Sequence, residues 1–394
     1  MAVNRSLINP TSNPLLEQAL REKLSRRGET SGSLGELEPL ALRLGLIQNT
    51  LKPRFRAPQI AIFASDHGLV VDGIGAPGAV PTALLVQNLL ASKLPLGVFA
   101  RIQGLELSVV DCGLAESVAP HARLLARKIA HGTRNARVTA AMSLDHAHAA
   151  IRAGMEIADS LPGNVVACAG VGVGAHQSAA LVISRLANAD LRSLIGTGPQ
   201  AKAEDLAHQM TVLQGAQARH KDVIDPVEVL AAFGGFEIAM MVGVMLVAGS
   251  KRHLIMVDGI SACAALMVAS RIAAAVTDYC VFCRSHSHLG LDHALAQFQA
   301  HAAKSALRYQ IEAARFVKAR CEKDMKLVGD LVESGRHGDT FDVVADFWRQ
   351  AMADYAEQAA RLAKIESGIA SETADKIRDE VRSANADIAV SMAA

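Results

Sequence analysis

Five short apolar runs recur along the chain, and each ends in a small polar cluster that contains aspartate, glycine or histidine. Continuous apolar runs of this kind are typical of parallel strands that are buried on both faces of a sheet. The five runs are IAIFASDHG (60–68), LELSVVDCG (105–113), GNVVACAG (163–170), HLIMVDG (253–259) and DYCVFCRSH (278–286).

Between these runs, apolar residues repeat with the spacing of amphipathic helices. Strands that alternate with helices predict an α/β fold with a Rossmann-like parallel sheet and flanking helices. In such folds the ligand site lies at the carboxyl ends of the strands. The helices predicted in this region span residues 82–103, 145–160, 176–187, 226–248 and 261–275.

The pattern also predicts how the chain is divided. Two long amphipathic helices, at 303–333 and 341–367, follow the last strand, and we expect them to pack as a hairpin on the core or on a second subunit. Two shorter helices, at 14–26 and 36–48, precede the first strand. The predicted parts are an N-terminal helical segment (1–57), an α/β core (58–298) and a C-terminal helical extension (299–394).

Composition narrows the class of protein. The 394 residues carry a net charge of +1 without a long run of like charge, which argues against nucleic acid or an anionic membrane as a partner. The six cysteines lie mostly in apolar runs and do not suggest a disulfide framework. The first residues lack the apolar run of a secretory signal, so we expect a cytoplasmic protein.

One stretch, VLAAFGGFEIAMMVGVMLVAG (229–249), has the length of a membrane span. Glu237 lies near its centre, where a charge costs roughly 2.5–3.5 kcal/mol on insertion scales. The Gly234-Gly235 pair would also interrupt a helix. We therefore expect a buried core segment here rather than a membrane helix.

Two glycine clusters indicate a phosphorylated ligand. AGVGVGAHQS (169–178) follows a predicted strand and precedes a helix, where backbone N–H groups and the helix dipole favour an anion. LIGTGPQ (194–200) follows that helix. A glycine-rich turn of this kind is as often purely structural, and neither cluster fits a Walker loop or a dinucleotide fingerprint. The candidate phosphate-binding residues are Gly170, Gly172, Gly174, Gly196, Thr197 and Gly198.

Several titratable residues end strands or begin helices. Asp66, His67 and Asp258 follow strands and are candidate substrate ligands, although the aspartates could equally cap turns. His176, at a helix start, could bind an anion or act as a base. Cys280 and Cys283 lie in a predicted strand, where residues three apart face opposite sides, so we expect no metal site and no cofactor.

In this order, the motifs resemble those of the nicotinate-nucleotide:dimethylbenzimidazole phosphoribosyltransferase family over about residues 14–298. The resemblance implies a Rossmann-like domain, a smaller helical domain built from both chain ends, and a homodimer. The matching words include GSLGELEPLALRLGLIQ (32–48), IFASDHGLVVDGI (62–74), HGTRNARVTAAMS (131–143), VGVGAHQSAAL (171–181), LIGTGP (194–199), VEVLAAFGGFEIA (227–239) and DGISACAALMVASRIAAAVTDY (258–279).

The chain also departs from the family pattern. The family's glycine loop reads Glu-Met-Gly-Ile-Gly-Asn-Thr-Thr, whereas residues 170–177 here read GVGVGAHQ. The phosphate-facing lysine of the family falls at about Gln209, and residues 75–88 lack the polar side chains of the base pocket. The family's Gly-Glu-Gly-Thr-Gly loop, whose glutamate is the general base, has no counterpart after residue 299.

A base of the azole type must lose its N–H proton as it attacks the nucleotide, and a positioned general base contributes about 10²–10⁴-fold. The candidates to replace the missing glutamate are Glu237, His176 and His286. Three functions stay open at this point. The first is a phosphoribosyltransferase, a pentosyltransferase of cobamide lower-ligand assembly, that uses nicotinate mononucleotide and an altered acceptor base. The others are a non-catalytic paralogue that binds nucleotide or joins a partner subunit in a hetero-oligomer, and a phosphoribosyl hydrolase or nucleosidase.

Overall fold

The structure is a computed structural model that describes residues 8–75, 79–195 and 203–283, together with residues 323, 326, 346, 347, 349–354 and 357. The chain divides into two compact units, Met1–Ala300 and His301–Ala394. In the second unit, Lys323 Nζ lies 2.6 Å from Asp354 Oδ2. Most of the predicted C-terminal helices lie outside the described residues.

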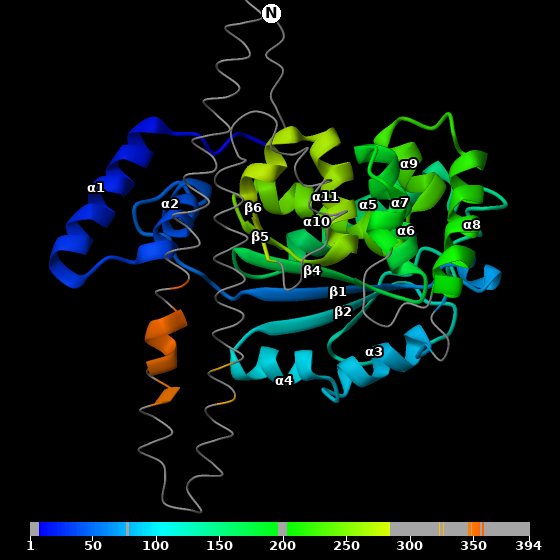
Figure 1. Cartoon of the computed structure of the whole chain (residues 1–394), viewed down its shortest axis with the longest axis horizontal. Helices are drawn as coiled ribbons and strands as arrows, with labels where there is room; N and C mark the ends of the chain where they lie inside the picture. The colour runs from blue at the N-terminus through cyan, green and yellow to red at the C-terminus, as the bar shows by residue number, and fades with distance from the viewer. Residues whose placement is uncertain are drawn as a thin grey trace, which may run out of the picture. The chain divides into compact units, whose positions relative to one another are not determined.

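A parallel sheet forms the centre of the first unit (Figure 1). Its strand order is β3-β2-β1-β4-β5-β6, the order of the doubly wound Rossmann-like fold. The predicted fold class and the five predicted strands are confirmed. The strands are β1 (Gln59–Ser65), β2 (Glu106–Gly113), β3 (Leu124–Ala126), β4 (Val165–Val171), β5 (Leu254–Val257) and β6 (Cys280–Phe282).

Helices cover both faces of the sheet, with α3 and α4 on one face and α5, α6, α10 and α11 on the other (Figure 1). The helix α10 lies across four strands and is buried along almost its whole length. The helices of the core are α3 (Thr82–Leu90), α4 (Pro95–Ile102), α5 (Leu144–Ser160), α6 (Ala175–Ala187), α7 (Leu191–Ile195), α8 (Ala203–Arg219), α9 (Pro226–Phe233), α10 (Phe236–Ser250) and α11 (Gly259–Ile272), with the 3₁₀ turns η2 (Gly68–Asp72) and η3 (Ala274–Tyr279).

Two of the predicted helices are each two helices. The prediction of one helix over 82–103 is wrong, because the chain turns at 91–94 and Pro95 begins α4. Proline fits the first turn of a helix but not its interior. The pattern over 226–248 divides into α9 and α10 at Gly234-Gly235, the interruption that the glycine pair predicts.

The apolar stretch 229–249 lies inside the core, and the Glu237 side chain in it is fully buried. Among the described residues, one stretch, Thr82–Ile102, meets the length and composition of a membrane span. It comprises α3, the turn at 91–94 and α4, and α3 packs on β1 and β2.

The N-terminal part comprises helices α1 (Pro14–Ser31) and α2 (Glu38–Ile47) with the 3₁₀ turn η1 (Gly35–Leu37). It contacts the core at Arg252, which donates to the Leu46 and Ile47 carbonyls, and at the segment before β6. The Thr11 N–H donates to Asp278 Oδ2 at 2.9 Å, and the Tyr279 hydroxyl donates to the Asn9 carbonyl at 2.7 Å. The Arg43 guanidinium donates to the Thr277 carbonyl at 3.1 Å. These bonds hold the start of the chain against η3.

Candidate functional site

The site lies where the strand order reverses, between β1 and β4. The chain leaves β1 toward α3 on one face of the sheet and leaves β4 toward α6 on the other face (Figure 1). The two carboxyl ends therefore diverge, and a crevice forms between them. Asp66 and His67 follow β1, and Gly172 and Gly174 follow β4.

The Asp66 carboxylate organises this crevice. Its Oδ2 accepts the N–H of Ala115 at 2.8 Å, and its Oδ1 accepts the Thr82 hydroxyl at 2.5 Å. Thr82 Oγ1 in turn accepts the N–H of Val173 at 3.1 Å. Both oxygens of Asp66 are thus engaged by the protein, and the carboxylate fixes the glycine turn through Thr82.

The turn between β4 and α6 requires glycine at two positions. A Cβ on Gly172 would lie 1.9 Å from the Ser65 carbonyl oxygen. The ends of β1 and β4 therefore approach so closely that only glycine fits at position 172. Gly174 adopts a left-handed conformation, with φ of 88°, and caps α6. The N-terminus of α6 consequently opens at the switch point, where its dipole favours an anion.

His67 and Glu237 form a buried pair beside this turn. His67 Nε2 lies 3.1 Å from Glu237 Oε1, and the two side chains are 1% and 0% exposed. Glu237 lies in the first turn of α10, and no hydrogen bond from a described residue reaches either of its carboxylate oxygens. A carboxylate in this position depends on its histidine partner and on the helix N-terminus for stabilisation.

A cavity of about 560 Å³ opens next to the pair. Its wall is largely apolar, and the polar side chains in it include those of Asp66, His67, Thr82 and Glu116. Small-molecule sites commonly combine an apolar wall with a few placed polar groups. The described lining residues are Asp66, His67, Val70, Gly73, Gly75, Ala79, Pro81, Thr82, Ala83, Ala115, Glu116 and Val173.

A second cavity, of about 840 Å³, extends from the other side of the glycine turn along the sheet. Gly170, Gly172, His176 and Asp258 all line it. His176 Nε2 lies 3.2 Å from the Leu194 carbonyl oxygen, and burial lowers the pKa of His176. The imidazole is therefore poorly suited to carry the positive charge that would bind a phosphate.

The structure thus brings five of the predicted residues together: Asp66, His67, Gly172, Gly174 and Glu237. Gly170, His176 and Asp258 line the second cavity, and the predicted Gly196, Thr197, Gly198 and His286 lie outside the described residues. Sequence reasoning did not single out Thr82 and Glu116. The only sequence feature that could have indicated a role for Thr82 is its position at the start of a predicted helix.

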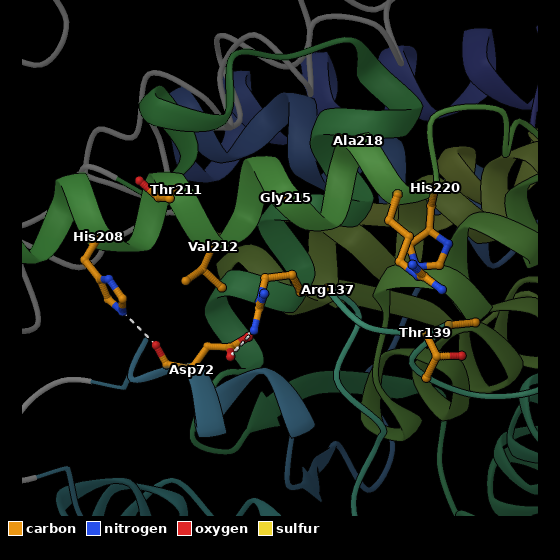
Figure 2. A pocket seen from close by; sticks show the side chains of 11 residues that line it. Asp72, Arg137, Thr139, His208, Thr211, Val212, Gly215, Ala218 and His220 are labelled. Atoms are coloured by element: carbon orange, nitrogen blue, oxygen red, sulfur yellow. Dashed lines mark hydrogen bonds and ion pairs between the residues drawn. The ribbon is translucent and has the colours of Figure 1, made fainter.

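A third hollow, of about 1060 Å³, lies between α8 and the turn around Arg137 (Figure 2). The Arg137 guanidinium donates to both Asp72 oxygens at 2.8 Å and lowers the pKa of that carboxyl. His208 Nε2 lies 2.7 Å from the Asp72 carbonyl oxygen. These contacts hold η2, and with it the segment after His67, against α8.

The cysteines near β6 lie in an apolar environment. Burial raises the pKa of Cys283 to about 12 and raises that of Cys280 still further. A zinc ligand must be a thiolate, which burial disfavours here. Within the described ranges, no three histidine, cysteine or acidic residues are grouped so that they could hold a metal ion.

The doubly wound sheet, the glycine turn at its switch point and the cavity beside it define an α/β protein of the nucleotide-binding, Rossmann-like class. The chain belongs to the phosphoribosyltransferase family, because the family model described as "Phosphoribosyltransferase" matches residues 9–307.

Curated relatives and solved structures agree with this assignment. The chain is 40% identical over 294 residues to the nicotinate-nucleotide–dimethylbenzimidazole phosphoribosyltransferase of Cupriavidus taiwanensis, covering 74% of this chain and 85% of that protein. It is 40% identical over 292 residues to the enzyme of the same name from Cupriavidus necator, covering 72% and 84%. The crystal structure of CobT from Thermus thermophilus is similar with a TM-score of 0.66 and 26% identity, covering 73% of this chain and 87% of that one.

Proposed function

We propose that this chain is a phosphoribosyltransferase that moves phosphoribose from nicotinate mononucleotide to a base, as in the assembly of the lower ligand of cobamides. The observation that carries the proposal is the family match over residues 9–307. The sequence resemblance assigns the family's glycine loop to residues 170–177, and Gly172 and Gly174 of this segment lie at the switch point. The names of the relatives specify the donor and one acceptor.

The nucleotide phosphate is proposed to bind at the N-terminus of α6, after Gly174, because helix N–H groups and the dipole favour an anion there. Gly170, Gly196, Thr197 and Gly198 are proposed to complete the phosphate site. The acceptor base is proposed to occupy the cavity of about 560 Å³, against Val70 and Val173. Because much of this wall is apolar, we expect acceptors that differ from dimethylbenzimidazole or add to it.

The test is an assay of nicotinate release by the full chain, with and without an acceptor base. Release that requires the base supports transfer. Release without base indicates a hydrolase or nucleosidase, and binding without release indicates the non-catalytic paralogue. Calorimetry with nicotinate mononucleotide measures that binding. Gly174→Asp places a negative charge at the proposed phosphate site and should abolish the nucleotide-induced rise in Tm.

We further propose that the protein is a cytoplasmic homodimer, or a hetero-oligomer with a paralogue. The proposal rests on the apolar stripes predicted over 303–333 and 341–367 and on the dimer that the family resemblance implies. Light scattering of the full chain at micromolar concentration tests it, and a clean monomer would contradict it.

A further inference from the structure

The pair of His67 and Glu237 has the arrangement of a proton relay. Glu237 is fully buried and is absent from the cavity wall, whereas His67 forms part of that wall. The imidazole therefore lies between the carboxylate and the cavity, with Nε2 toward Glu237 Oε1 at 3.1 Å. In catalytic dyads of this type, the carboxylate orients the ring and stabilises the imidazolium that forms when the ring accepts a proton.

Gly235 packs directly against both members of this pair, because it has no side chain. A Cβ on Gly235 would lie 2.2 Å from Glu237 Oε2 and 2.4 Å from His67 Cε1. Any side chain there would displace the carboxylate and the ring together. Placing Glu237 at the first turn of α10 stabilises its negative charge through the helix dipole. His67 Nε2 is the polar side-chain atom that faces this carboxylate, at 3.1 Å.

Other titratable groups near the pair are less suited to accept a proton from a ligand. Both Asp66 oxygens accept hydrogen bonds from the protein. The Cys112 thiol, from β2, is fully buried, and burial together with the Glu237 charge raises its pKa well above the ordinary value. Glu116 is exposed on the cavity wall and is the alternative carboxylate to be tested. His146 packs on Phe236, the residue before Glu237, with ring centroids 6.1 Å apart.

We propose that His67 is the catalytic base of the transfer reaction and that Glu237 is its positioning residue; this rests on the proposed function. One nitrogen of the acceptor azole attacks C1′ of the nucleotide and forms the new N–C1′ bond. The bond from C1′ to the nicotinate nitrogen breaks, and nicotinate leaves with the electron pair. The proton on the other azole nitrogen moves to His67 Nδ1, while Nε2 stays beside Glu237 Oε1, 3.1 Å away in this structure. Solvent later takes up that proton.

The experiment measures transfer by the full chain to two acceptors, dimethylbenzimidazole and the more acidic nitrobenzimidazole. The variants are His67→Gln, which retains a donor near Glu237 but cannot take up a proton, and Glu237→Gln, which removes the negative charge. Glu116→Gln tests the alternative base. His220→Gln is the matched control, because His220 Nε2 also makes one contact, to the Ala136 carbonyl oxygen at 2.9 Å, at a distance from the cavity.

We expect His67→Gln and Glu237→Gln to lower kcat for dimethylbenzimidazole on the order of 10²-fold or more, with the KM for nucleotide nearly unchanged. The loss should be smaller for nitrobenzimidazole, because a more acidic N–H needs less help from a base. His220→Gln and Glu116→Gln should leave the ratio between the acceptors unchanged.

An equal loss for both acceptors would assign the pair a structural role and overturn the relay. A loss confined to Glu116→Gln would also overturn it, while leaving the proposed function intact. If the wild-type chain binds nicotinate mononucleotide by calorimetry but releases no nicotinate with any acceptor base supplied, the proposed function itself fails, and the relay fails with it.

Discussion

The Thr82 hydroxyl donates to Asp66 Oδ1 across 2.5 Å, so the carboxylate after β1 is tied to the first turn of α3. The same hydroxyl oxygen accepts the N–H of Val173 in the glycine turn after β4. A single side chain thus connects the two strand ends that diverge at the switch point. Asp66 therefore positions the glycine turn indirectly, through the two hydrogen bonds of the Thr82 hydroxyl.

Thr82→Val should therefore loosen the turn while preserving side-chain shape. It leaves a carboxylate oxygen and the Val173 N–H without their partner, which costs about 1–3 kcal/mol. We expect a KM for nicotinate mononucleotide raised by about tenfold, with a smaller change in kcat, measured by steady-state kinetics. Thr211→Val is the control, because the Thr211 hydroxyl bonds within its own helix at the Ala207 carbonyl. Equal KM values for the two variants would contradict this role of Thr82.

Gly172→Ala should destabilise the fold strongly. The new Cβ would lie 1.9 Å from the Ser65 carbonyl, which is backbone of a buried strand and cannot move aside easily. We expect the free energy of unfolding in urea to fall by more than about 3 kcal/mol. Gly28→Ala is the matched control, because a Cβ there meets no atom within 4 Å in α1. It should stabilise the chain by up to about 1 kcal/mol. Equal stabilities of the two variants would be incompatible with the close approach.

Particular elements explain what the sequence could and could not predict. Most residues of β1 and β2 are buried, so their apolar runs stand out from the amphipathic helices between them. In β4 only Val166 and Cys168 are buried, and its run is recognised from its apolar composition. The glycine turn and the Asp66-His67 pair could be placed at one sheet edge, because parallel strands end at the same edge.

Contacts between segments that are distant in the sequence could not be predicted, because the residues around each partner do not indicate the other. Glu237 follows a glycine pair in an apolar helix, and nothing in its neighbourhood indicates that His67 is its partner. The helix break before Pro95 was missed because the apolar repeat continues through it. The helix α8 was missed because Val212, Leu213 and Ala216 are its few buried positions.

His176 should make the stability of the protein depend on pH. Burial lowers its pKa in the folded state below the ordinary value of 6.5, against a smaller opposing effect of the Leu194 carbonyl. The unfolded chain therefore binds the proton more readily, and the stabilisation present above pH 6.5 is lost as the pH falls below it. We expect Tm to fall less steeply between about pH 6.5 and 5 in His176→Gln than in the wild type. Parallel Tm curves for the two proteins would exclude this contribution of His176.

Gly235→Ala should disturb the His67–Glu237 pair without removing either residue. The backbone at Gly235 is extended, with φ of −129°, so alanine causes no strain in the main chain. Its Cβ would instead meet Glu237 Oε2 at 2.2 Å and His67 Cε1 at 2.4 Å, both of which are side-chain atoms that can shift. We therefore expect a folded protein whose kcat falls by more than about tenfold while the KM for nucleotide changes little.

Gly215→Ala serves as the control for Gly235→Ala, because a Cβ at Gly215 makes ordinary contact with the Arg137 side chain at 3.4 Å. Circular dichroism and urea unfolding establish that both variants are folded, and transfer kinetics then compare them. In the relay, the ring must keep Nε2 toward the carboxylate so that Nδ1 can accept the proton of the base. A Gly235→Ala variant with wild-type kcat would show that the reaction tolerates displacement of the pair, and that the close packing of Gly235, His67 and Glu237 serves the fold alone.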